Sequence, residues 1–163
     1  MNYLVEYKKL EKRFALDFVS HFRNENILVN YPTEYQDIHE HWDLEILNCA
    51  ELSGKYDVKG MRKVNRHDNN PNPTIQWLEI LNVLGNKGWL LGKANYIVFE
   101  YILDWIIVDR FDIIKYLKNN IINQQSEYPE IFKLYTRKGR NDLITLVPFF
   151  DLMKMCKYII PKK

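Results

Sequence analysis

The stretch that decides the fold runs from His41 to Lys63 and reads HWDLEILNCAELSGKYDVKGMRK. Its two short apolar segments flank a Ser-Gly turn, a pattern that predicts two neighbouring strands. Asp43 and Asp57 stand 14 residues apart, the length of one hairpin, so we expect the two carboxylates to lie side by side. Residues two positions apart share one face of a strand, so Lys59 points the same way as Asp57. Two carboxylates and an ammonium that converge on one point indicate a site for metal-assisted hydrolysis.

Length and composition predict a single globular domain over residues 1–163. Hydrophobic residues make up 47% of the chain and charged residues 27%, a balance that excludes a disordered chain. The formal net charge of +2 neither demands nor excludes a nucleic-acid ligand. A binding face for nucleic acid therefore has to come from local clustering of basic residues.

The cysteine content favours a reducing compartment. Cys49 and Cys156 lie far apart, each in an apolar segment, which indicates two core thiols of a cytoplasmic protein. We expect no cleavable signal peptide, because charged residues begin at Glu6. No apolar run approaches the ~20 residues of a membrane helix, so we expect no membrane partner.

Hydrophobic periodicity predicts an amphipathic helix over residues 3–23, with an apolar stripe that includes Phe14 and Phe18. Glu11 precedes these two residues by three and by seven positions, so it lies on the same stripe. A carboxylate that faces a core needs a polar partner or a metal, and Glu11 is therefore a candidate site residue. Glu6 remains the alternative.

The rest of the chain reads as alternating strands and helices, which predicts an α/β fold with a mixed central β-sheet flanked by helices. Strands are predicted over 27–29, 42–47, 56–58, 74–83, 89–100, 102–108, 131–137 and 143–147, and helices over 110–120 and 149–159. Segments 32–40 and 124–129 are expected to be irregular, and 161–163 to be a frayed tail.

Two basic clusters are predicted to contact phosphates. One cluster lies in the loop that directly follows Lys59, and the other forms the glycine-containing turn between the last two predicted strands. Lysine and arginine side chains on such loops bind the nucleic-acid backbone without reading its sequence. The predicted DNA-binding residues are Arg62, Lys63, Arg66, Arg137, Lys138 and Arg140.

The order Asp43, then Asp57-x-Lys59, resembles the core motif of the PD-(D/E)XK nuclease superfamily, which has the restriction-endonuclease-like fold. Holliday-junction resolvases and many phage nucleases belong to that superfamily. Its first aspartate follows a proline, whereas Trp42 stands at that position here. The resemblance implies a metal-dependent DNA endonuclease that hydrolyses phosphodiester bonds, with junction or branched DNA among its substrates.

The resemblance also implies roles for individual residues. Asp43, Asp57 and the backbone carbonyl of Val58 would hold Mg²⁺ or Mn²⁺. Lys59 would orient or deprotonate the attacking water, or stabilise charge on the phosphoryl oxygen. Glu11 would be an outer ligand or a ligand of a second metal.

Five further residues leave the composition of the site open. Glu45 could replace Asp43 as the metal ligand, and His39 with His41 could form a histidine pair on a metal, although surface imidazoles are the simpler interpretation. Gln76 could orient the water or the lysine. Asn95 also stands where related proteins are expected to carry an aspartate, which leaves a metal role at that position in doubt.

The function itself has an alternative. The same fold could serve as a catalytically inactive nucleic-acid-binding or protein-interaction module, but the intact set of Asp43, Asp57 and Lys59 favours the enzyme. RNA is a weaker substrate hypothesis than DNA. The resemblance further predicts a homodimer. The apolar residues of the predicted C-terminal helix either offer its interface or belong to the core; they include Phe149, Phe150, Met153 and Met155.

Overall fold

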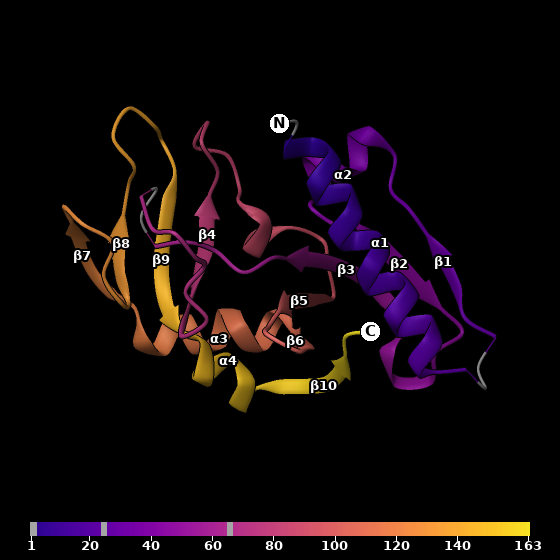
Figure 1. Cartoon of the computed structure of the whole chain (residues 1–163). Helices are drawn as coiled ribbons and strands as arrows, with labels where there is room; N and C mark the ends of the chain where they lie inside the picture. Colours follow the sequence, from indigo (N-terminus) through magenta and orange to yellow (C-terminus); the bar gives the residue numbers. More distant parts are fainter. Residues whose placement is uncertain (1–2, 24–25, 65–66) are drawn as a thin grey trace.

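The computed structural model describes residues 3–23, 26–64 and 67–163, with side chains described from Lys9 onward. Ten strands in these ranges form two sheets that lie next to each other (Figure 1). The six-stranded sheet contains, in spatial order, β1 (Leu28–Asn30), β2 (Leu44–Leu47), β3 (Gly54–Lys59), β5 (Tyr96–Glu100), β6 (Asp104–Asp109) and β10 (Cys156–Pro161). The four-stranded sheet contains β4 (Ile75–Leu81), β9 (Leu143–Pro148), β8 (Lys133–Tyr135) and β7 (Ile122–Ser126).

Helices flank the six-stranded sheet. They are α1 (Tyr3–His21), α2 (Glu34–Glu40), α3 (Arg110–Asn120) and α4 (Phe149–Lys154), with short 3₁₀ turns η1 (Ala50–Leu52) and η2 (Trp89–Leu91). Strands β3 and β5 are parallel, whereas the other neighbours in this sheet are antiparallel. The predicted α/β class with a mixed sheet is therefore confirmed. None of the described helices combines the length and apolarity needed to cross a membrane.

Two hydrophobic cores lie on opposite faces of the six-stranded sheet. On one face, Phe14 and Phe18 of α1 pack against Tyr56 of β3 and Trp105 of β6. On the other face, side chains of β5 and β6 pack against α3, α4 and the four-stranded sheet. Both faces of β5 and β6 are thus covered, which explains why their sequences, IVF and WIIV, are continuous apolar runs rather than alternating ones.

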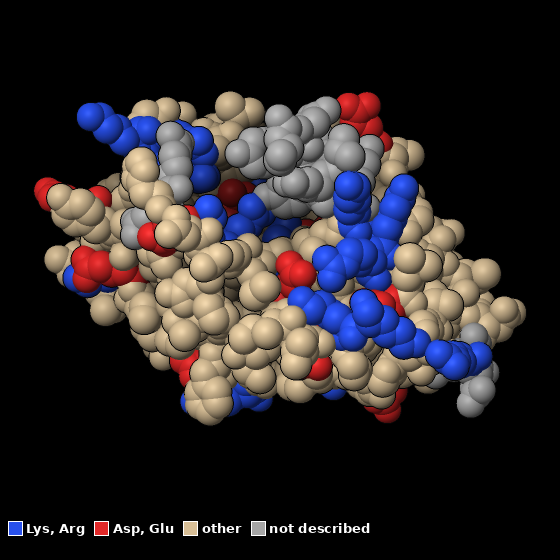
Figure 2. Space-filling model, in the orientation of Figure 1, with Lys and Arg blue, Asp and Glu red and all other residues tan. Residues whose placement is uncertain are grey.

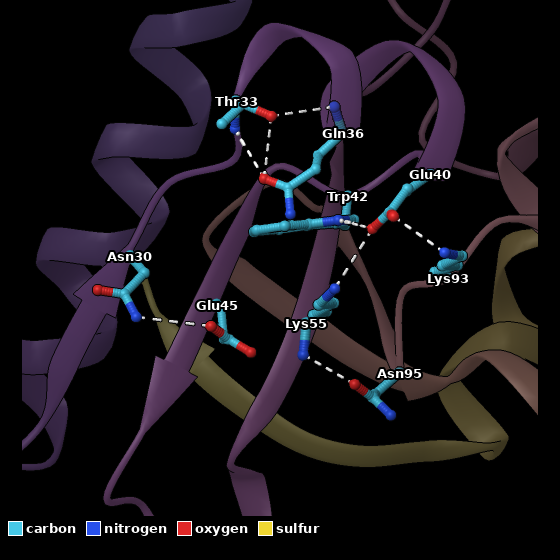
Figure 3. A network of polar contacts seen from close by, with 9 residues as sticks. All are labelled: Asn30, Thr33, Gln36, Glu40, Trp42, Glu45, Lys55, Lys93 and Asn95. Atoms are coloured by element: carbon cyan, nitrogen blue, oxygen red, sulfur yellow. Dashed lines mark hydrogen bonds and ion pairs between the residues drawn. The ribbon is translucent and has the colours of Figure 1, made fainter.

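The segment 32–40, expected to be irregular, forms the helix α2. Thr33 caps it, because its hydroxyl accepts a hydrogen bond from the Gln36 backbone N–H at 3.3 Å and the Gln36 side chain accepts one from Thr33 N–H at 3.0 Å (Figure 3). This reciprocal capping box stabilises a short helix with no buried residue. The expectation of an irregular segment was wrong because it considered only the polar composition of residues 32–40 and not the capping pair Thr33 and Gln36.

The chain from 149 onward differs most from the prediction. The helix ends at Lys154, and β10 follows and pairs antiparallel with β6. Lys162, expected in a frayed tail, donates from its backbone N–H to the Leu103 carbonyl at 2.8 Å and from Nζ to Glu100 at 3.2 Å. Apolar residues that look like a helix face therefore supply the edge strand of the main sheet instead.

Two smaller differences concern strand boundaries. The first half of the segment 124–129, expected to be a linker, belongs to β7, and residues 127–129 are irregular as predicted. The predicted strand over 89–100 begins with η2 and becomes a strand only at Tyr96. Cys49 and Cys156 are thiols that are not joined in a disulfide.

Candidate functional site

The pairing of β2 with β3 brings Asp43 and Asp57 together. Leu44 lies opposite Tyr56 in this antiparallel pair, so continuing the register by one residue sets Asp43 opposite Asp57. The Asp43 backbone N–H donates to the Tyr56 carbonyl at 2.7 Å, and its Oδ2 accepts from the Val58 backbone N–H at 2.6 Å. The two carboxyl groups interact directly.

Asp57 and Lys59 share the face of β3 that looks toward the four-stranded sheet. Tyr56 and Val58 point into the core under α1 instead. Lys59 Nζ lies 2.5 Å from Asp57 Oδ1. Asp57 is only 1% exposed, and its second oxygen, Oδ2, is buried without a hydrogen-bond partner among the described residues. A buried carboxylate oxygen without a hydrogen-bond donor costs free energy and is uncommon in folded proteins.

The electrostatics of the three groups follow from this crowding. Burial, reinforced by the charge of Asp57, raises the pKa of Asp43 well above its usual range. Burial also raises the pKa of Asp57, although Lys59 opposes that shift. Burial disfavours the Lys59 ammonium, but the two carboxylates outweigh it and raise the Lys59 pKa. One ammonium therefore serves two buried carboxyl groups, and a second positive charge at the centre would favour the ionised form of both.

A cavity of about 450 Å³ opens beside Lys59. Its walls come from the end of β3, the loop that follows it, β4 and the β8–β9 hairpin. Figure 2 shows Lys and Arg side chains gathered around a hollow on this face of the molecule. The charged and polar residues of the lining are Lys59, Arg62, Lys63, Gln76, Glu79, Arg137 and Arg140.

Four of the predicted DNA-binding residues thus meet at one cavity, although they come from two loops far apart in the sequence. They are Arg62, Lys63, Arg137 and Arg140. Lys138 is exposed at the hairpin turn and does not line the cavity. Arg66 lies outside the described residues, and so does the side chain of Glu6.

Glu11 is not brought into the centre. Its charge contributes, after burial, to the raised pKa of Tyr31, so the two side chains lie near each other. No three His, Cys, Asp or Glu side chains in the described part of the chain come together in a way that could hold a metal ion. A third carboxylate beside Asp43 and Asp57, as expected for Glu11, is therefore not found there.

Glu45 and the two histidines near the motif also lie away from the centre. Glu45 accepts a hydrogen bond from the Asn30 amide at 3.5 Å across the β1–β2 pair, so Asp43 is the acidic residue that meets Asp57. His41 adopts a left-handed conformation (φ 53°) that ends α2, and its Nε2 lies 3.0 Å from the carbonyl of Lys87. His39 is exposed on α2. Within the described ranges, the two imidazoles do not form a metal-binding pair with a third ligand.

Glu79 is a cavity residue that sequence reasoning missed. Burial raises the pKa of its carboxyl, while the nearby Lys59 and Arg137 oppose the shift. Its neighbour in the lining, Gln76, is 4% exposed. The available signal is a single acidic residue between apolar neighbours in the predicted strand, TIQWLEILNV.

A second carboxylate centre lies near the other end of β3, around Glu40 at the end of α2. The Glu40 carboxylate accepts from Trp42 Nε1 at 2.9 Å, from Lys93 Nζ at 2.9 Å and from Lys55 Nζ at 3.4 Å (Figure 3). These hydrogen bonds, with that from Lys93 the strongest, lower the pKa of Glu40 to about 2. Asn95 fastens the same region, because its Oδ1 accepts from the Lys55 backbone N–H at 2.8 Å.

Comparison of the chain with protein-family models, with curated proteins and with solved structures found no match. The case for a function therefore rests on the site itself.

Proposed function

We propose that this protein is a metal-dependent DNA endonuclease that hydrolyses phosphodiester bonds at the centre formed by Asp43, Asp57 and Lys59. The observation that carries the proposal is the buried Asp57 carboxylate. One of its oxygens pairs with Lys59, and the other has no hydrogen-bond partner among the described residues. This arrangement stands beside a cavity lined with arginine and lysine.

The donor set suits a hard divalent cation. Asp57 Oδ2 and the Asp43 carboxylate are oxygen ligands of the kind that Mg²⁺ and Mn²⁺ prefer, and Mg²⁺ commonly binds through only one or two carboxylates. The Val58 carbonyl remains the predicted third ligand. A bound cation would supply Lewis-acid stabilisation of charge at a phosphate oxygen.

The chain's own residues would bind and orient the substrate. Lys59 carries the charge nearest to the carboxylate pair and can donate to a phosphate oxygen or to the attacking water. Arg137 and Arg140 from the hairpin, with Arg62 and Lys63 from the opposite loop, would bind the phosphates on either side of the scissile bond. Holding the phosphate within reach of Lys59 lowers the entropic part of the barrier.

One observation favours the alternative of an inactive binding module of the same fold. The described residues supply two carboxylates at the centre and no third acidic or imidazole ligand. A module that only binds nucleic acid needs the basic cavity but does not need a third metal ligand.

Cleavage of labelled DNA with Mg²⁺ or Mn²⁺ tests the proposal. The panel contains duplex, single strand, flap and four-way junction, and compares wild type with Asp57→Asn and with Asp112→Asn as the matched control. Asp112 is exposed on α3 and lies outside the cavity lining. We expect wild type and Asp112→Asn to cleave, and Asp57→Asn to lose activity by at least about 10²–10³-fold.

Thermal melting with added cation separates the enzyme from the inactive module. A ligand that binds only the folded state stabilises it, by about 2.7 kcal/mol at 100 times the dissociation constant. Mg²⁺ or Mn²⁺ should raise the melting temperature of wild type and of Asp112→Asn, but not that of Asp57→Asn. Absence of both cleavage and a cation-dependent shift in wild type would refute the nuclease and leave the binding module.

A further inference from the structure

The cavity beside Lys59 has a lining that phosphate binding alone does not require. Besides the basic residues, two indole rings, those of Trp77 and Trp89, form part of its wall. Trp77 is only partly buried. Flat aromatic faces beside guanidinium groups are the combination that single-stranded nucleic-acid sites use to stack bases and hold the backbone.

The two tryptophans are held differently. Trp89 is already engaged, because Lys59 Nζ lies 5.0 Å from its ring centroid and Phe99 packs edge-on against it at 6.4 Å. Trp77 is anchored at its edge, where Nε1 donates to the Lys63 carbonyl at 3.2 Å, and Tyr135 flanks it at 6.3 Å. A ring that is fixed in place at low entropic cost is suited to stacking with a base.

The remaining wall suits a base better than a second phosphate. The carboxylate of Glu79 would repel a phosphate, but it can accept a hydrogen bond from an exocyclic amino group. The Gln76 amide can both donate and accept. The volume of about 450 Å³ lies in the range of about 300–1,000 Å³ typical of small-ligand sites, which suits one nucleotide rather than a segment of duplex.

We propose that this cavity binds one unpaired nucleotide of a DNA strand, with its base against Trp77 and its phosphate toward Arg137 and Arg140. The inference rests on the proposed function for the assumption that the ligand is a nucleic acid, and it adds the substrate class. The strand that reaches Lys59 is single-stranded at that point, as in a single strand, a frayed end or the unpaired flap of a branched DNA.

Binding to three labelled ligands tests this inference in the uncleaving Asp57→Asn protein. The ligands are an oligodeoxycytidylate, whose bases carry an exocyclic amino group, a strand of the same length and charge with abasic residues, and a duplex, measured by fluorescence anisotropy. Stacking on one aromatic side chain gives an expected preference for the base-containing strand over the abasic strand of about fivefold to 100-fold. Trp77→Phe should keep most of this preference and Trp77→Ala should remove it.

Two further variants separate stacking from charge. Arg140→Ala should weaken the binding of all three ligands together and reduce the salt dependence of binding. Tyr128→Ala removes an aromatic residue that is 72% exposed outside the cavity, and should change nothing. If Trp77→Ala does not fold, as judged by thermal melting, the comparison of base-containing with abasic strands decides alone.

The outcomes distinguish this inference from the proposed function. Equal binding of base-containing and abasic strands, or tighter binding of duplex than of single strand, would overturn the inference even if wild type cleaves DNA. A preference for bases that depends on Trp77, without cleavage by wild type, would support the inference and refute the nuclease. Absence of both binding and cleavage would overturn both.

Discussion

Two lysines on one face of β3 have closely similar neighbours and opposite electrostatic situations. Lys55 lies 3.4 Å from Glu40 and 4.4 Å from the ring centroid of Trp42. Lys59, four residues further on, lies 2.5 Å from Asp57 and 5.0 Å from the ring centroid of Trp89. Each lysine thus lies close to a carboxylate and to an indole ring. The types of these neighbouring residues therefore do not distinguish the two ends of the strand.

The balance of charge does distinguish them. Glu40 receives hydrogen bonds from an indole N–H and two ammonium groups, which lower its pKa. Asp57 shares one ammonium with Asp43, and burial raises the pKa of both carboxyl groups. A carboxylate surrounded by donors stabilises the fold and needs no further ligand. In a buried carboxyl pair with one ammonium, by contrast, a bound cation would stabilise the ionised form of both groups. This difference favours the Asp57 end of the strand as the functional centre.

Replacing each lysine by methionine is the strongest way to break the comparison. Under the proposed function, Lys59→Met removes the ammonium that would lie beside the scissile phosphate, and charge stabilisation or proton transfer of this kind typically contributes about 10²–10⁴-fold to rate. We expect cleavage to fall by at least about a hundredfold. Lys55→Met leaves Glu40 with two donors and should cleave at nearly the wild-type rate with a slightly lower melting temperature. Equal loss of cleavage in the two variants, measured at saturating Mg²⁺, would contradict the distinction.

Much of the centre could be predicted from the sequence because it depends on local rules. The two-residue period of a strand sets Asp57 and Lys59 on one face, and the length of the hairpin brings Asp43 opposite. The sequence also predicts helix α3 with its observed bounds, and the structure adds an N-cap at Asp109, whose side chain accepts from Phe111 N–H at 2.8 Å.

The opposite wall of the cavity could not be predicted, because it depends on how the two sheets pack. Gln76 and Glu79 line the same cavity as Lys59 because the four-stranded sheet packs into the second core. The C-terminal residues show the same limit. Phe149 and Leu152 do anchor a helix turn, but the next apolar residue that is buried, Ile160, pairs with β6. Periodicity cannot distinguish an edge strand from a continued helix over so few residues.

The pH dependence of stability tests whether the Glu40 carboxylate stabilises the fold through its charge. The folded-state pKa of Glu40 is lowered to about 2, below its ordinary value. Its contribution to stability is therefore fully present above the unfolded-state pKa of about 4.3, and is lost as the pH falls toward 2. Glu40→Gln should lower the melting temperature at pH 7, and the difference from wild type should shrink between pH 5 and pH 3. A difference that stays constant over this range would show that the loss is steric rather than electrostatic.

Asn95 provides the test with the smallest expected effect, because it forms hydrogen bonds with the Lys55 end of β3 and not with the Asp57 end. Its Oδ1 accepts from the Lys55 backbone N–H at 2.8 Å, and its own backbone N–H donates to the Lys55 carbonyl at 2.7 Å. Asn95→Ala removes only the side-chain bond, which is worth about 0.5–1.5 kcal/mol, or a few degrees in melting temperature. Asn95→Asp keeps the acceptor and should stay close to wild type. Cleavage should be unchanged in both variants. A loss of activity at unchanged stability would contradict this expectation and tie the Lys55 end of the strand to the functional centre.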